Sequence, residues 1–185
     1  MTNQTDTRGQ IMDAFTDQLA ATGYPGISLV EVARTVGIRK PSIYHHFPGG
    51  KEDLYAAVAE RYIEDTSARM RAALDSDGPL PHRLIALAKA TADDNGTVSF
   101  EQRIYDTLGQ VGETTKNRIS ELYVNGLLEP VVDLFAGAVA DGEVNGDPQF
   151  LMNAFLHVTR ASDLDSGPDN AERIVSLFLD GARPR

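Results

Sequence analysis

Between Ser28 and Tyr55 the chain gathers residues whose types and spacing could do chemistry. Ile43 and Phe47 are four residues apart and share one face of a short predicted helix. The other faces carry small and hydrogen-bonding side chains, with Pro41, Ser42 and His45 roughly opposite and Tyr44 and His46 beside them. An apolar face can hold such a helix to a core while its polar face enters the major groove of DNA. On periodicity alone, two short core helices with polar outer faces explain the pattern equally well.

Basic residues at the helix starts could contact the phosphates that flank a groove. Arg39 and Lys40 stand at the start of the short helix and Lys51 begins the next one, where backbone N–H groups also point outward. The whole chain has 17 Lys and Arg against 27 Asp and Glu, a formal net charge of −10, and such a surface repels DNA. From residue 28 to residue 55, however, four basic residues oppose three acidic ones. The acidic surplus therefore lies elsewhere.

Neither a metal centre nor an enzyme site is predicted. His45 and His46 are adjacent, so their side chains diverge by about 100° and are poor partners for one metal. His157 has apolar neighbours, which favours a core position over a ligand contact. The chain has no cysteine, no glycine-rich phosphate loop and no Gly-x-Ser-x-Gly motif. We therefore predict a protein that is not an enzyme, with no cofactor and no metal.

The elements that must position these residues are helices throughout, because no period-two pattern occurs. We expect an all-α fold of about nine helices: a three-helix N-terminal domain with a helix-turn-helix, residues 1–50, and a larger helical bundle, residues 51–185. The expected helices are Arg8–Thr22, Leu29–Val36, Lys40–Phe47, Lys51–Asp75, Leu80–Thr91, Phe100–Leu108, Glu113–Ala140, Pro148–Ser162 and Ala171–Gly181. Ser28 and Glu31 form a capping-box pattern. Pro130 should kink or split its helix.

The actual string of residues decides between the two interpretations of the short helices. It closely resembles the N-terminal signature of the TetR family of bacterial transcriptional regulators over about residues 8–60. The resemblance rests on the Tyr-His-His-Phe run at 44–47, the following proline, the Lys-Glu-x-Leu opening at 51–54, and the upstream Phe15, Gly23, Ser28, Glu31, Val32, Ala33, Val36 and Gly37. It implies a homodimer that binds palindromic double-stranded operator DNA, usually as a repressor, and that a small molecule in the C-terminal domain releases.

Carried over residue by residue, the resemblance implies base or phosphate contacts for Lys40, Ser42, Tyr44 and His45 and a phosphate contact for Lys51. With the adjacent Arg39 and Pro41, these residues form the predicted DNA-binding set. The segment Pro48-Gly49-Gly50-Lys51 is one residue longer than in many members, and this form resembles the drug- and flavonoid-responsive branch. The extra residue should shift Lys51 relative to the phosphates. Leu29 and Val30 stand where many members carry a backbone-contacting Thr or Arg.

The last two helices are apolar on more than one side. Seven of the nine residues from Phe150 to Val158 are apolar, which predicts core on one side and a partner subunit on the other. By resemblance these helices pair in a four-helix bundle. The predicted dimer interface comprises Leu151, Phe155, Val158, Ile174, Val175 and Phe178. The two-fold axis of such a dimer matches half-sites about 34 Å apart.

A pocket for a hydrophobic or aromatic effector is expected among the helices of the larger domain. The candidate lining residues are Tyr62, Met70, Phe100, Tyr105, Tyr123, Phe135, Phe155, His157 and Arg160, although aromatic and Met side chains at helical spacing also describe a simple core. A constitutive DNA-binding dimer without an effector is the alternative function. The polar start of the chain and the lack of an apolar run of about 20 residues predict a cytoplasmic protein without membrane contact.

Overall fold

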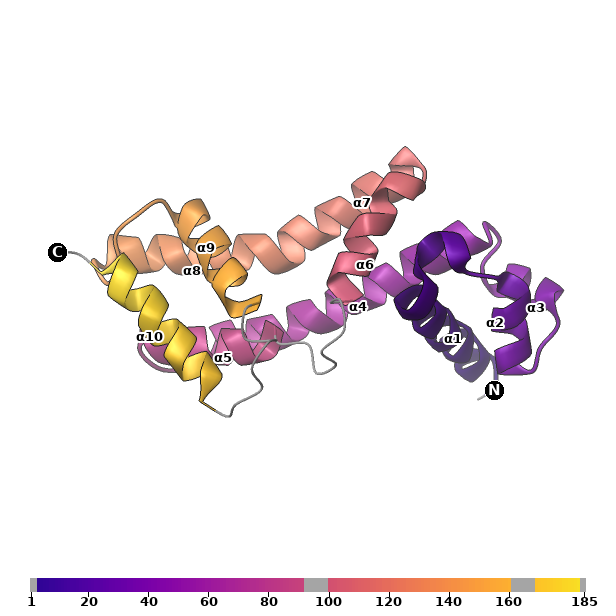
Figure 1. Ribbon diagram of the computed structural model, residues 1–185, viewed down its shortest axis with the longest axis horizontal. Helices are drawn as coiled ribbons and strands as arrows, with labels where there is room; N and C mark the ends of the chain where they lie inside the picture. Colours follow the sequence, from indigo (N-terminus) through magenta and orange to yellow (C-terminus); the bar gives the residue numbers. More distant parts are fainter. Residues whose placement is uncertain (1–2, 92–99, 161–168, 184–185) are drawn as a thin grey trace. The chain divides into compact units, whose positions relative to one another are not determined.

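The computed structural model describes residues 3–91, 100–160 and 169–183, and throughout them the chain is helical, with no strand (Figure 1). The predicted all-α class is therefore confirmed, and the described part holds nine helices when the continuous run Glu113–Ala140 is counted as one. Packing divides the chain into two compact units. Unit 1 comprises residues 1–62 and 97–121, and unit 2 comprises residues 63–96 and 122–185. The functional boundary at residue 50 stays a prediction.

Unit 1 consists of helices that include the two of the predicted helix-turn-helix. Its helices are α1 (Asn3–Gly26), α2 (Leu29–Val36), α3 (Lys40–His46), the first half of α4 (Lys51–Leu74), α6 (Phe100–Thr107) with the 3-10 turn Leu108–Gln110, and most of α7 (Glu113–Tyr123). Gly23 interrupts α1 with a left-handed φ of 67°, a conformation that costs glycine little. The regular part of α1 therefore ends where the sequence predicts.

The core of unit 1 joins the first three helices to α4. Phe15 and Leu19 of α1, Ile43 of α3 and Tyr55 of α4 are fully buried, and α1 packs against α2 and α6. The hydroxyl of Tyr55 donates a hydrogen bond of 2.8 Å to the carbonyl oxygen of Ile104 in α6. Burial raises the pKa of Tyr55 well above its ordinary value, so the phenol stays neutral in the folded protein.

Unit 2 is built from the second half of α4, α5 (Leu80–Thr91), the π-helical turn Val124–Leu128, α8 (Glu129–Ala140), α9 (Pro148–Arg160) and α10 (Asn170–Ala182). In this unit α8 packs against α9, and α10 packs against α5 and α9 (Figure 1). Phe135, Phe155 and Phe178 pack ring against ring, with centroids 5.2–5.9 Å apart. They form the aromatic centre of the unit.

At Pro130, where the sequence predicts a kink or a split, the helix contains a π-helical turn. Pro130 stands in the first turn of α8, directly after the π-helical turn Val124–Leu128. A proline has no N–H to donate and crowds the carbonyl four residues earlier. The wider π turn accommodates this locally, so the run Glu113–Ala140 continues as one helix.

In the described residues one helix, Glu113–Ala140, is long and apolar enough by composition to cross a membrane, with a mean hydropathy of 1.3 over 18 residues. The sequence analysis, which looked for an uninterrupted apolar run of about 20 residues, did not identify this helix. The core helix of a soluble protein meets the same criterion, and the C-terminal half of this one buries Val131, Leu134, Phe135 and Ala138 in unit 2. Of the 18-residue window, 33% is buried, so the helix is covered by the described residues over part of its surface only.

Candidate nucleic-acid interface

A glycine turn joins α2 to α3. Gly37 adopts a left-handed φ of 74°, its N–H donates to the carbonyl of Arg34, and the N–H of Ile38 donates to the carbonyl of Ala33. This pair of bonds is the Schellman arrangement, which satisfies the last carbonyls of a helix. Arg39 is extended and caps α3. Two short helices joined by such a turn form a helix-turn-helix.

The second helix of this motif has one buried face and one exposed face, as its periodicity predicts. Ile43 and the following Phe47 are 0% and 2% exposed and hold α3 to unit 1. The rest of the predicted DNA-binding set on α3 lies at the surface: Arg39, Lys40, Pro41, Tyr44 and His45 are exposed and Ser42 is half-buried. The exposed residues therefore share a surface that a groove of DNA could meet.

In the longer loop before α4, Gly50 lies close to the ring of Tyr44. Gly50 has a φ of 69°, and a Cβ at this position would lie 3.0 Å from Cε1 of Tyr44. Its N–H donates to the carbonyl of Phe47 over 2.8 Å. Lys40 places its ammonium nitrogen 6.0 Å from the centre of the Tyr44 ring. The absence of a side chain at Gly50 therefore leaves room for the ring, a feature that sequence spacing did not reveal.

Lys51, the predicted phosphate ligand, already has partners within unit 1. Its ammonium nitrogen lies 4.5 Å from the centre of the Tyr24 ring and donates over 3.5 Å to the carbonyl of Pro25. Burial lowers the pKa of Lys51. The adjacent carboxylates are also engaged, because Asp53 accepts the N–H of Gly49 and Glu52 accepts the N–H of Gly112 and the hydroxyl of Thr115. The phosphate contact predicted for Lys51 is not tested by these contacts, and it requires the ammonium to leave Tyr24 and Pro25.

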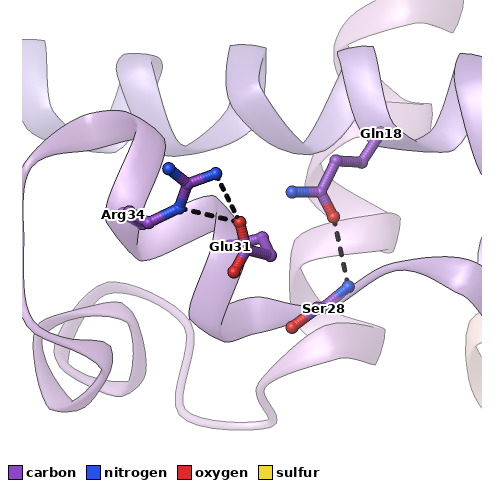
Figure 2. Close-up of polar contacts among 4 residues, drawn as sticks. All are labelled: Gln18, Ser28, Glu31 and Arg34. Carbon is purple, nitrogen blue, oxygen red and sulfur yellow. Dashed lines mark hydrogen bonds and ion pairs between the residues drawn. The ribbon is translucent and has the colours of Figure 1, made fainter.

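The predicted capping box at the start of α2 is wrong. Figure 2 shows that Glu31 pairs instead with Arg34, at 2.7 Å, while the backbone N–H of Ser28 donates to Oε1 of Gln18 over 3.1 Å. Ser28 makes no side-chain cap bond. The pairing of Arg34 leaves Arg39 and Lys40 as cations of the motif that form no ion pair within the described residues. Val30, at the start of α2, is 55% exposed.

Arg8 also holds α3 in place, a role that the sequence did not indicate. Its guanidinium lies 4.9 Å from the centre of the Phe47 ring and donates to the sulfur of Met12. Arg8 therefore fixes the end of α3 against α1. A cation–π contact between residues so far apart in the sequence leaves no periodic signal that could have revealed it.

The candidate pocket residues do not form one group. In unit 1 the rings of Tyr62 and Phe100 meet edge to face at 5.3 Å, and Tyr105 is 66% exposed. In unit 2, Met70, Phe135 and Phe155 are buried in the core, Tyr123 is half-buried and His157 is exposed. Arg160 ends α9, and its side chain lies outside the described part. The nine residues are thus divided between the two units, and their role in ligand binding stays a prediction.

The candidate interface residues lie mostly inside unit 2. Leu151, Phe155, Ile174 and Val175 are buried within the subunit, and Val158 and Phe178 are half-buried. The large apolar side chains that α9 and α10 expose are Phe150, 68% exposed, and Leu177, 70% exposed. Both were missing from the predicted set, because a helix that is apolar nearly all round does not show which side faces outward.

Residues 29–46 thus have the geometry of a helix-turn-helix, a motif that many DNA-binding proteins contain. Residues 11–58 match the family model described as "Bacterial regulatory proteins, tetR family". This segment is therefore similar to the N-terminal segment of that family's members.

The chain is similar to known transcription regulators, over a different share of its length in each case. The transcriptional activator FasR of Mycolicibacterium smegmatis is 32% identical over 88 residues, 48% of this chain and 40% of FasR. The transcriptional regulator LmrA of Bacillus subtilis is 43% identical over 49 residues, 26% of each chain. The chain thus spans less than half the length of these relatives. A tetR-family regulatory protein from Rhodococcus RHA1 shares the fold, with a TM-score of 0.80, 18% identity, and coverage of 97% of this chain and 98% of that one.

Proposed function

We propose that this chain is a transcription regulator that binds palindromic operator DNA as a homodimer through α3. The observation that carries the proposal is the exposed face of α3 in a segment that matches the TetR family. No enzymatic role is part of the proposal, and a regulator of this kind acts in the cytoplasm. The family resemblance favours repression, whereas FasR is named an activator; a reporter gene behind the operator decides the sign.

Selection of bound DNA from a random pool with purified protein tests the proposal. We expect a palindrome with half-sites about one helical turn apart. Tyr44→Ala and His45→Ala should each weaken binding to this DNA by about tenfold or more, since a specific base contact contributes about 1–3 kcal/mol, and should leave the dimer intact. Tyr105→Ala, which removes an exposed ring of α6 in the same unit, is the matched control. Unchanged affinity in both α3 variants would refute the assignment of α3.

The salt dependence of binding distinguishes the two possible roles of Lys51. If only Arg39 and Lys40 contact phosphates, a dimer makes four such contacts, and log K falls against log salt with a slope of about −3.6. If Lys51 leaves Tyr24 to join them, the slope is about −5.4. We expect the shallower slope, and we expect Lys51→Ala to leave it unchanged.

The dimer surface that we propose includes Phe150 and Leu177. Large apolar side chains exposed this far mark interaction sites when they lie together on one surface. Leu177→Glu should therefore produce a folded monomer in light scattering at concentrations where the unmodified chain is dimeric. Ser176→Glu adds the same charge at the neighbouring exposed position and serves as the control.

The proposal includes a small-molecule effector. The resemblance to the drug- and flavonoid-responsive branch favours a hydrophobic or aromatic ligand. The alternative, a constitutive DNA-binding dimer, is supported by the tight packing of Phe135, Phe155 and Phe178. A flavonoid such as quercetin that releases the selected DNA favours the first. If a panel of such aromatics leaves binding unchanged, the second holds.

A further inference from the structure

Unit 2 contains a cleft that the proposed DNA-binding function does not use. It has a volume of about 450 Å³ and lies between the end of α4, the start of α5, and α8 with the loop that follows. None of the nine candidate pocket residues lines it. The volume is within the usual range for small-molecule sites, about 300–1,000 Å³.

The floor of the cleft is apolar and its rim is acidic. Leu74, Leu80 and Leu134 are buried beneath it. Four carboxylates surround it, from Asp75, Asp133, Asp141 and Glu143, all on exposed residues and none in an ion pair within the described part of the chain. Such a surface attracts cations that also carry aliphatic segments.

Two arginines limit the charge of the cleft without cancelling it. Arg83 is turned toward α4, where its Nε donates to the carbonyl of Leu74 over 3.0 Å. Arg71 is exposed and lines the same cleft. Two cations against four carboxylates leave a formal charge of −2. A ligand with at least two positive groups therefore matches the site.

One wall of the cleft leaves space for a ligand. Gly137 of α8 lines the cleft, and a Cβ added there meets no atom within 4 Å. The backbone of α8 is therefore open to a ligand at this position.

We propose that this cleft binds a linear aliphatic polyamine, whose ammonium groups pair with the carboxylates and whose methylene segments lie on the leucines. The cleft has no aromatic lining residue, and sites for quaternary or aromatic cations are typically built from aromatic rings. Separated carboxylates around an aliphatic floor match instead an ion with separated charges and aliphatic spacers. Binding at this site requires neither DNA nor the proposed regulatory function.

Calorimetric titration of the full-length protein with spermidine at low salt tests the proposal. The double variant Asp133→Asn/Asp141→Asn should weaken binding by about tenfold, since each exposed ion pair contributes up to about 1 kcal/mol. The control Glu64→Gln/Asp65→Asn removes two exposed charges of α4 that do not line the cleft. An equal loss in both double variants would show diffuse attraction to an acidic protein and would overturn the site.

Two further variants test the shape and the charge of the cleft separately. Gly137→Leu should fill the cleft and weaken spermidine binding by about tenfold or more, whereas Ala136→Leu on the neighbouring exposed position should leave it unchanged. Arg71→Ala should tighten binding, because it removes a positive charge beside the ligand. Circular dichroism and thermal unfolding confirm that each variant is folded. A benzyl trimethylammonium ion that binds more tightly than spermidine would also refute the proposed ligand class.

Discussion

Substitution of Gly50 by alanine tests how the loop before α4 supports the recognition helix. Gly50 has a φ of 69°, and a left-handed conformation costs a non-glycine residue about 1–2 kcal/mol. The new Cβ would also lie 3.0 Å from Cε1 of Tyr44. The ring is 43% exposed and can move, so we expect this contact to add about 1 kcal/mol, the low end of the cost of overpacking.

Gly37→Ala separates the two contributions. Gly37 has a φ of 74°, but a Cβ there meets no atom within 4 Å. Both glycines lie in unit 1, so the same unfolding transition reports on both. In urea unfolding, Gly37→Ala should lower the free energy of unfolding by about 1–2 kcal/mol and Gly50→Ala by about 2–3 kcal/mol.

The double variant Gly50→Ala/Tyr44→Ala completes a thermodynamic cycle. Without the ring, alanine at position 50 should cost no more than the backbone conformation alone, which gives a coupling energy of about 1 kcal/mol. Gly50→Ala should also weaken binding to the selected DNA, because the displaced ring belongs to the predicted contact set. A coupling energy of zero, with DNA affinity unchanged, would refute the idea that Gly50 positions Tyr44.

Three further substitutions test contacts in both units. Tyr55→Phe should destabilise the protein by about 1 kcal/mol at pH 7, because it removes a buried hydrogen bond to the carbonyl of Ile104. Burial raises the pKa of Tyr55, so the unfolded chain releases the phenol proton at a lower pH than the folded chain. The free energy of unfolding of the unmodified chain should therefore fall by about 1.4 kcal/mol per pH unit above about pH 10. Tyr55→Phe should lack this fall when urea unfolding is repeated at alkaline pH. In urea unfolding, Gln18→Ala should lower the free energy of unfolding by about 1 kcal/mol and Ser28→Ala by less than 0.5 kcal/mol. A larger loss for Ser28→Ala than for Gln18→Ala would support the capping box instead. Ser67→Ala should leave stability unchanged or raise it by up to about 1 kcal/mol, because its buried hydroxyl has no hydrogen-bond partner in the described residues and such a group is costly, and a clear loss in thermal unfolding would indicate a missed partner.

Helix type and position could be predicted from the sequence because both follow from local patterns. The expected Leu80–Thr91 and Leu29–Val36 coincide with α5 and α2. The expected end of the helix from Pro148, at Ser162, lies outside the described residues. The buried face of α3 followed from the spacing of Ile43 and Phe47, since both contact the same core. Periodicity encodes which side of a helix is apolar, and that information was sufficient for the helix-turn-helix.

The contacts that give each side chain its role could not be predicted, because they join residues far apart in the sequence. The signature at the start of α2 identified a capping box, yet Gln18 of α1 satisfies the N–H of Ser28 instead. Lys51 matched a phosphate ligand by position, yet the C-terminal end of α1 lies within reach of its ammonium. In both cases a residue distant in the sequence binds the polar group to which the local pattern assigned another partner.

The same engagement of side chains explains why the proposed DNA-binding surface has few cations without an ion pair in the described residues. Of the basic side chains in the motif, that of Arg34 is paired within α2 and that of Lys51 is held by α1. Arg39 and Lys40 remain exposed at the start of α3, where they can position the helix on the phosphates but supply little affinity by themselves. Discrimination between DNA sequences must then depend on uncharged groups such as Tyr44 and Ser42, which are sensitive to the geometry that Gly50 and Phe47 impose. The interface is therefore expected to gain its specificity from the packing of α3, and to lose it when that packing is changed.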